Sequence, residues 1–238
     1  MALPIQSTPT YNLKIPSSSE DAKFRPFLIK EEKALLLAQQ SEDPRVMADT
    51  LKSVISSCLV SKIDVEKLAL FDLEYLFTQI RAKSVGETVE LIFACDDCDD
   101  EKARVKLDID LTKIDVKKSE DHSNKIQLFD DVGVVMKYPN FNTVLKLENA
   151  NTDQIDSIFE IIYNSIDYIY NSDEIYHSAE TAKEEVMEFI NNLTQEQFGK
   201  IQKFFDTIPK LSTDVKYTCP VCNKEHDKVI EGLTSFFQ

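Results

Sequence analysis

The sequence predicts an α+β fold in which helical segments flank a small antiparallel sheet with two zinc-knuckle hairpins. Apolar residues recur at helical spacing over residues 30–83 and again over 153–208. Between them, residues 86–138 alternate apolar and polar side chains, which is typical of strands that have one face in water. Each of two C-x-x-C pairs lies between two strand-like segments, and the second hairpin covers residues 214–231. Helices and strands therefore follow one another in blocks, as in α+β proteins.

The composition is that of a globular protein with an acidic surface. The 238 residues allow one large domain or two small ones, and 42% are hydrophobic and 29% charged. The formal net charge of −15 disfavours a nucleic-acid backbone or an anionic membrane as the main partner. Residues 141–200 carry nine of the fifteen excess negative charges, so the acidity is concentrated in a helical segment. Such a face is usually a solvated surface, although it is also suited to a basic partner.

The sequence lacks the usual signals for membranes and secretion. The longest apolar runs are interrupted by charged residues and are too short to span a membrane. Residues 1–19 lack the basic and apolar regions of a secretory signal. We therefore expect a protein that is not bound to membranes and that stays in the reducing cytoplasm where it is made. In that compartment, cysteines are better interpreted as metal ligands or small core residues than as disulfides.

Two segments with different organisation are predicted. Residues 1–26 contain Pro4, Pro9, Pro16 and Pro26 together with three consecutive serines, and we interpret them as an extended N-terminal arm. This arm either becomes ordered on a partner, where it buries its apolar residues, or is a floppy tail. Residues 27–238 are predicted to form a single α+β domain.

Three helices are expected in the first part of this domain, over residues 30–40, 44–58 and 64–83. The third is apolar nearly all round, which predicts a central helix or one in an interface. It also contains Asp72 and Glu74, which we expect to form ion pairs or to face solvent, because nothing nearby offers a nucleophile or a metal cage.

The later elements are predicted from alternation and capping signals. Strands are expected over residues 88–93, 103–109, 125–129, 132–138, 214–218 and 227–230. A helix with one apolar stripe is expected over 153–170. Thr181 with Glu184 and Thr194 with Gln197 predict capping boxes of two further helices, which end before Pro209.

The strongest chemical signal is a pair of knuckles that contain Cys95, Cys98, Cys219 and Cys222. In a zinc knuckle a tight turn points two sulfurs at one metal, so two knuckles supply the four thiolates of a closed tetrahedral site. We expect these cysteines to bind one structural Zn²⁺ that joins the end of the chain to its middle. Two alternatives remain open: the cysteines are reduced and metal-free, or the second knuckle binds a separate ion with His226 as an extra ligand.

Catalysis is poorly supported, and we expect the protein not to be an enzyme. A four-thiolate site has no open position for water or substrate. The sequence contains no P-loop, dinucleotide-binding, metalloprotease or nucleophile-elbow motif. The acids beside the first knuckle, such as Asp96 and Asp97, lack the spacing of a calcium loop and are expected to be solvated. Cys58 lies on an apolar helix face and is given no chemical role.

Several segments, taken in order, resemble the baseplate hub proteins of T-even-type contractile-tailed bacteriophages. The segments are YNLKIPSSS at 11–19, KFRPFLIKEEKALLLA at 23–38, FDLEYLFTQIRAKSVGE at 71–87, the two C-x-x-C pairs, and GLTSFF at 232–237. The resemblance implies a structural virion protein of the tail baseplate hub, made in the host bacterial cytoplasm. It would bind other phage baseplate and tail hub proteins, with homo-oligomers within the baseplate as one arrangement. A baseplate assembly factor absent from the virion is the alternative within this family.

An alternative from another class is a zinc-ribbon adaptor that binds nucleic acid or transcription machinery. Such a protein should carry Lys, Arg and aromatic residues near its knuckles. The first knuckle is instead surrounded by acidic residues, so no nucleic-acid partner is expected. A metal-dependent hydrolase is the third and least supported interpretation, because it would need a second, open metal site.

Overall fold

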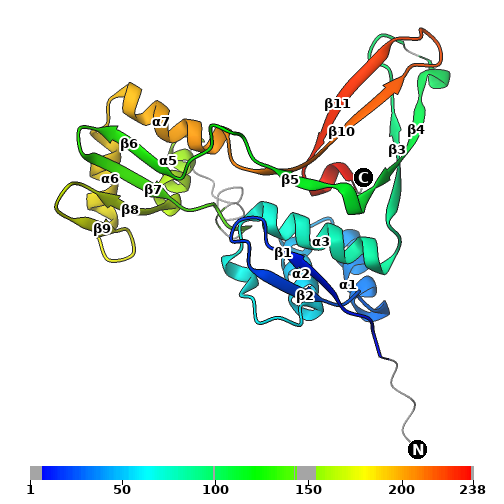
Figure 1. Cartoon of the computed structure of the whole chain (residues 1–238), viewed down its shortest axis with the longest axis horizontal. Helices are drawn as coiled ribbons and strands as arrows, with labels where there is room; N and C mark the ends of the chain where they lie inside the picture. The colour runs from blue at the N-terminus through cyan, green and yellow to red at the C-terminus, as the bar shows by residue number, and fades with distance from the viewer. Residues whose placement is uncertain (1–6, 99, 142, 144–153, 237–238) are drawn as a thin grey trace, which may run out of the picture. The chain divides into compact units, whose positions relative to one another are not determined.

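The computed structural model describes residues 7–98, 100–141, 143 and 154–236. Helices and small antiparallel sheets confirm the predicted α+β fold class (Figure 1). None of the described helices is both long and apolar enough to cross a membrane.

The chain divides into two compact units. Unit 1 comprises Met1–Val65, Phe71–Lys117 and Lys210–Gln238, and unit 2 comprises Glu66–Leu70 and Lys118–Pro209. The single domain expected over residues 27–238 stays a prediction, because a compact unit is defined by its contacts and a domain by its ability to fold alone.

Unit 1 begins with a hairpin of β1 (Tyr11–Lys14) and β2 (Asp21–Phe24). In this part of the predicted extended arm, Ile15 is completely buried and Phe24 is 2% exposed. Ser17 donates hydrogen bonds from its backbone N–H (2.9 Å) and its hydroxyl (2.5 Å) to the carboxylate of Asp72. Part of the predicted arm therefore packs on its own chain, because Ile15 and Phe24 are buried and Ser17 is hydrogen-bonded to a buried acid.

Three helices follow in unit 1: α1 (Ile29–Gln40), α2 (Pro44–Cys58) and α3 (Leu70–Ser84). The first two match the predicted ranges. α3 begins later than expected, because Val65–Lys67 form a separate 3-10 turn. Leu76 and Ile80 of α3 are fully buried, which agrees with the prediction of a central helix.

The two acids of α3 are withdrawn from solvent and accept hydrogen bonds from backbone N–H groups. Asp72 is fully buried, and Glu74 is half-buried. Glu74 accepts a hydrogen bond from the backbone N–H of Leu233 at 3.1 Å, and burial raises the pKa of its carboxyl. Both carboxylates thus accept backbone hydrogen bonds from segments that are far away in the sequence.

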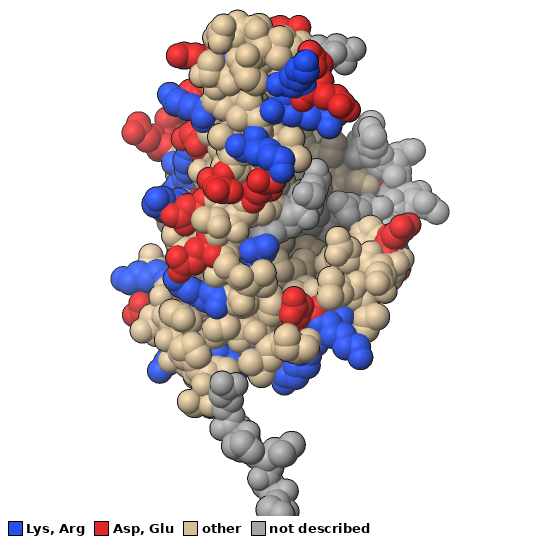
Figure 2. All heavy atoms as spheres, turned by 90° about the vertical axis from the view of Figure 1, so that its right-hand side faces the viewer, with Lys and Arg blue, Asp and Glu red and all other residues tan. Residues whose placement is uncertain are grey.

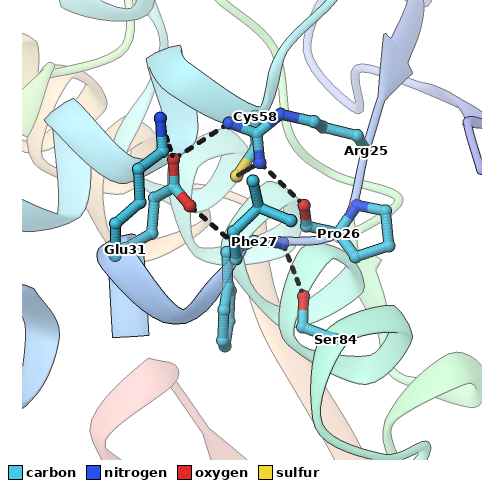
Figure 3. Close-up of polar contacts among 8 residues, drawn as sticks. Arg25, Pro26, Phe27, Glu31, Cys58 and Ser84 are labelled. Atoms are coloured by element: carbon cyan, nitrogen blue, oxygen red, sulfur yellow. Dashed lines mark hydrogen bonds and ion pairs between the residues drawn. The ribbon is translucent and has the colours of Figure 1, made fainter. Parts of the chain in front are cut away.

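A buried ion pair lies where the N-terminal hairpin leads into α1 (Figure 3). Arg25 Nη2 lies 2.9 Å from Glu31 Oε1, and Glu31 is 6% exposed. The other carboxylate oxygen of Glu31 accepts the N–H of Leu28 at 2.8 Å, which caps the helix. Arg25 Nη1 also donates to the carbonyl of Pro26 and contacts Cys58 Sγ. Burial raises the pKa of the Cys58 thiol to about 11, so this thiol is protonated near neutral pH.

Two hairpins complete unit 1. β3 (Thr88–Phe93) pairs with β4 (Val105–Asp110), and β10 (Lys210–Thr218) pairs with β11 (Glu225–Glu231). The short strand β5 (Asp115–Lys117) joins the other edge of β10. Short 3-10 turns are formed by Glu101–Ala103, Leu111–Lys113 and Leu233–Phe236. The core between the hairpins includes the buried side chains Ile109, Leu111, Leu211, Val215, Ile230 and Phe236.

Unit 2 is a four-stranded sheet with helices packed against it. The strand order is β6 (Lys125–Phe129), β7 (Val132–Met136), β8 (Ile166–Tyr170) and β9 (Ile175–His177). The helices are α5 (Gln154–Ser165), α6 (Lys183–Asn191) and α7 (Gln195–Asp206). Their shared core includes Leu128, Val134, Met136, Ile162, Ile190 and Phe204.

The sequence prediction is wrong at two places in unit 2. The helix expected over 153–170 ends at Ser165, and Ile166–Tyr170 forms strand β8, while residue 153 lies outside the described residues. These five residues are rich in β-branched and aromatic side chains, and they pair with β7. The capping box at Thr181 is also absent, because α6 begins after Ala182 and the Thr181 hydroxyl donates to the carbonyl of His177.

The second capping box is confirmed. The N–H of Thr194 donates to Gln197 Oε1 at 2.8 Å, and the N–H of Gln197 donates to Thr194 Oγ1 at 3.3 Å. This reciprocal pair satisfies two N–H groups that the first turn of α7 would otherwise leave without partners.

Replacement of Glu31 by Gln should lower the free energy of unfolding by about 2 kcal/mol, because it leaves the partly buried Arg25 without its counter-charge. Burial alone would raise the pKa of Glu31, but hydrogen bonds from Arg25 and Leu28 and the charge of Arg25 lower it below 4.5. The stabilisation is therefore present above pH 4.5 and is lost as the pH falls through the lowered pKa. Urea unfolding between pH 3 and 7 measures it, with E32Q as the control. Equal stability of E31Q and E32Q at pH 7 would contradict the prediction.

Two glycines of unit 2 should respond in opposite ways to replacement by Ala. A Cβ at Gly133 would lie 2.5 Å from the backbone oxygen of Ile126 and also overlap the Tyr170 hydroxyl. We expect G133A to destabilise the protein by about 2 kcal/mol, as overpacking does. A Cβ at Gly199, within α7, would meet nothing within 4 Å, and we expect G199A to stabilise by about 0.5–1 kcal/mol. Chemical unfolding of both variants checks this, and a neutral G133A would show that the close approach has no energetic effect.

Candidate metal centre

The four predicted cysteines come together at the tips of two hairpins of unit 1. Cys95 and Cys98 follow β3, and Cys219 and Cys222 lie in the turn between β10 and β11. In Figure 1 the tips of the two hairpins lie side by side, at the top right. Each knuckle is thus placed by an antiparallel strand pair, as the alternation in the sequence predicts.

The sulfur geometry fits one tetrahedral metal ion. All four Sγ atoms lie within 4.8 Å of one another. Cys95 Sγ is 3.8 Å from Cys222 Sγ, and Cys98 Sγ is 4.0 Å from Cys219 Sγ. In a tetrahedral site with metal–sulfur bonds of about 2.3 Å, neighbouring sulfurs are about 3.8 Å apart. All four cysteines are free thiols, and their separation is that of ligands around a common centre.

The backbone of the second knuckle is arranged to stabilise a thiolate. The N–H of Asn223 donates to the carbonyl of Cys219, and the N–H of Cys219 donates to the carbonyl of Lys224. Asn223 has a φ of 58°, a left-handed conformation that Asn tolerates better than most residues. In this turn the N–H of Cys222 and then that of Val221 point at the Cys219 sulfur and lower the pKa of its thiol to about 7.

The first knuckle has a mixed electrostatic character. The N–H of Asp97 points at the Cys95 sulfur, yet burial and the neighbouring thiols leave the pKa of Cys95 raised. Hydrogen bonding to Cys222 and burial raise the pKa of Cys98 to about 12. Four neighbouring thiols therefore cannot all ionise by themselves near neutral pH. A bound divalent cation would supply the charge that allows four thiolates to coexist.

Direct contacts also hold the two tips together. The hydroxyl of Tyr217 donates to the carbonyl of Ala94 at 2.9 Å, and the rings of Tyr217 and Phe93 have their centroids 5.3 Å apart. Asp96 forms an ion pair with Lys228 at 3.1 Å, and Asp97 forms one with Lys224. These acids are therefore engaged by lysines of the opposite hairpin, which is a different role from that of calcium ligands.

His226 lies outside the cysteine cluster among the described residues. It is opposite Tyr217 in the register of β10 and β11, and its ring stacks on the Tyr217 ring at a centroid distance of 4.8 Å. This arrangement does not support the alternative in which His226 completes a separate metal site. Sequence reasoning missed the Tyr217–His226 stack, although the alternation of β11 signals that His226 lies on the inward face.

Charges of both signs are mixed on the surface near the hairpins. Figure 2 shows Lys and Arg side chains interspersed with Asp and Glu side chains on the face that it presents. On the hairpin of β3 and β4 and the turn after it, charged side chains form cross-strand or local pairs, such as Lys106 with Glu90 and Lys113 with Asp110. A nucleic-acid interface would require clustered positive charge, whereas the face shown in Figure 2 carries charges of both signs.

The comparisons with known proteins point to one family. The family model described as T4 bacteriophage base plate protein matches residues 8–238. The matched range includes all four cysteines and every described helix and strand. No curated protein and no solved structure matches the chain.

Metal binding at this centre should be detectable as one bound metal ion per chain, held by the four cysteines. Replacement of Cys98 by Ser should strongly reduce the bound metal, whereas replacement of Cys58 by Ser should leave it unchanged, because Cys58 lies outside the cluster. Chelation should lower stability, by about 4 kcal/mol if the free metal had exceeded its Kd a thousandfold. Elemental analysis and thermal unfolding measure both effects. A protein purified without metal, with a thermal midpoint insensitive to chelator, would mean that the four cysteines are simply reduced thiols.

Proposed function

Since the chain belongs to the family of T4 bacteriophage base plate proteins, we propose that it is a structural subunit of the tail baseplate hub with one structural zinc ion. The family match over residues 8–238 is the observation that carries this proposal. It also confirms the resemblance to T-even-type baseplate proteins and implies a location in the virion tail. The position within the hub rests on the order of the sequence motifs.

The proposed zinc ion has a mechanical role. Cys95, Cys98, Cys219 and Cys222 would hold it, and four thiolates favour zinc over harder cations such as Mg²⁺ or Ca²⁺. When bound, the ion supplies a crosslink between two turns more than a hundred residues apart. A closed set of four sulfur ligands leaves no position for substrate, which supports a role in stability and a non-enzymatic subunit.

Two surface features support contacts with other proteins. α1 places Ile29, Leu36 and Leu37 at helical spacing on one face, and all three are exposed, Ile29 by 78%. In unit 2 the exposed acids of α6, Glu184, Glu185 and Glu188, would favour a basic partner. We infer that the partners are other baseplate and tail hub proteins, with further copies of this chain as one arrangement. The subunit would be made in the host cytoplasm and incorporated into the tail.

The competing functions have less support. An assembly factor of the same family would share the fold and differ in being absent from the finished particle. A nucleic-acid adaptor would need free positive charge beside the knuckles, but Lys224 and Lys228 are paired there with Asp97 and Asp96.

A structural subunit should be recovered from purified phage tails at a fixed ratio to other baseplate proteins. Quantitative mass spectrometry of infected-cell lysate and purified tails measures this ratio. If the chain is abundant in the lysate but missing from tails, the protein is an assembly factor and the structural proposal fails. Tails from phage carrying Cys98→Ser should contain less of this protein than tails carrying Cys58→Ser, because only the former loses a proposed zinc ligand.

A further inference from the structure

A groove in unit 1 is bordered by one strand from each hairpin. It is lined by Glu90–Phe93 of β3, by residues 228–231 of β11, and by Ser235. β3 pairs only with β4, and β11 only with β10, among the strands that the structure describes. Each of these strands therefore has an open edge. Open edges expose backbone N–H and C=O groups that can pair with another strand.

The register identifies which groups of β3 point outward. The N–H of Leu111 donates to the carbonyl of Glu87, and this pair continues the register in which Val89 lies opposite Ile109. In an antiparallel ladder, hydrogen-bonded and non-hydrogen-bonded pairs alternate. The N–H and C=O groups of Glu90 and Ile92 therefore point away from β4, toward the open edge.

The same reasoning applies to β11. The N–H of Cys219 donates to the carbonyl of Lys224, and the N–H of Gly232 donates to the carbonyl of Leu211. Both pairs fit a single register between β10 and β11. The backbone groups of Asp227, Val229 and Glu231 therefore point away from β10. The carbonyl of Glu231 accepts a hydrogen bond from the Ser235 hydroxyl at 2.7 Å, so within the groove the open part of this edge lies at Val229.

The groove contains side chains that favour a particular kind of segment. Ile92 is 58% exposed and Val229 is 56% exposed, one on each bordering strand. Because β3 runs toward the cysteine tips and β11 runs away from them, Glu90 and Glu231 lie farther from the tips than this apolar pair. These carboxylates are about half exposed, although each has a lysine partner on its own hairpin.

We propose that this groove binds one extended segment of another baseplate protein by strand addition. The proposal rests on the baseplate role proposed above. The segment pairs with the outward backbone groups of Glu90, Ile92 and Val229 and places an apolar side chain against Ile92 and Val229. By charge complementarity, it carries a basic residue where it passes Glu90 and Glu231.

Amide hydrogen exchange with residue resolution tests the backbone contacts directly. In the isolated protein the amides of Glu90, Ile92 and Val229 should exchange fast, and in purified tails at least about tenfold more slowly. The inward amides of Leu91 and Ile230 serve as controls, because β4 and β10 already protect them. If the chain is present in tails and the outward amides still exchange as in the isolated protein, the strand-addition proposal is overturned.

Proline variants test the same edge during phage assembly. Ile92→Pro and Val229→Pro each remove one outward N–H of the groove without removing a hydrogen bond to β4 or β10. Thr88→Pro and Asp227→Pro are matched controls, because they remove outward N–H groups on the same strands outside the groove lining. We expect the first pair to reduce the yield of complete tails at least about tenfold relative to the controls. Equal yields from both pairs would overturn the proposal.

A charge-reversal variant avoids any change in the backbone. The double variant Glu90→Lys and Glu231→Lys should reduce tail yield, whereas reversal of Asp214, which lies outside the groove, should not. Circular dichroism checks that each variant is folded. If the chain is absent from tails, the structural role fails, and the yields of the proline and charge variants still decide whether the edge binds a segment during assembly.

Discussion

Two turns far apart in the sequence meet at the cysteine cluster, and this meeting organises the sheet half of unit 1. A two-stranded hairpin alone is marginally stable in water, because it has no second layer to cover its apolar face. Here each hairpin covers the other, with Val215 and Ile230 buried against the face that includes Ile109. The sulfurs at 3.8–4.0 Å and the Tyr217 hydrogen bond to Ala94 fix the ends of both hairpins. A metal ion would convert this contact into a crosslink.

Helix α3 organises the helical half of unit 1, as the cysteine cluster organises the sheet half. Its first turns carry Asp72 and Glu74, which accept backbone hydrogen bonds from Ser17 and Leu233 respectively. The N-terminal hairpin and the C-terminal 3-10 turn are therefore attached to the same part of one helix. A buried carboxylate with backbone donors is costly to leave without them, so these acids specify where both segments dock. The apolar surface of α3 provides the packing, and the two acids determine the positions at which the N-terminal hairpin and the C-terminal 3-10 turn dock on it.

Much of this arrangement was predictable from local patterns. The knuckles could be paired from the sequence because strand, C-x-x-C, strand is a self-contained signal, and the structure brings the four sulfurs together. Residues 166–170 could not be assigned by spacing alone, because isoleucines at intervals of three and four also fit a helix. In the structure these residues pair with β7 and form a strand. The role of Asp72 depends on Ser17, a contact over 55 positions that no periodicity reveals. Open strand edges likewise become visible only when the register is known.

The pairing of β5 with β10 has a consequence for how this chain can vary. Lys117 lies opposite Lys210, so the long segment of unit 2 leaves unit 1 and returns to it at adjacent positions of one sheet, whereas Glu66–Leu70 joins unit 2 separately. Residues 118–209 thus occupy the place of a hairpin loop, and such loops tolerate large changes in length at small entropic cost. Relatives could enlarge, shrink or exchange this segment without shifting the register of the strands that hold the cysteines. Residues 118–209 and the strands that hold the cysteines are in this sense free to evolve at different rates.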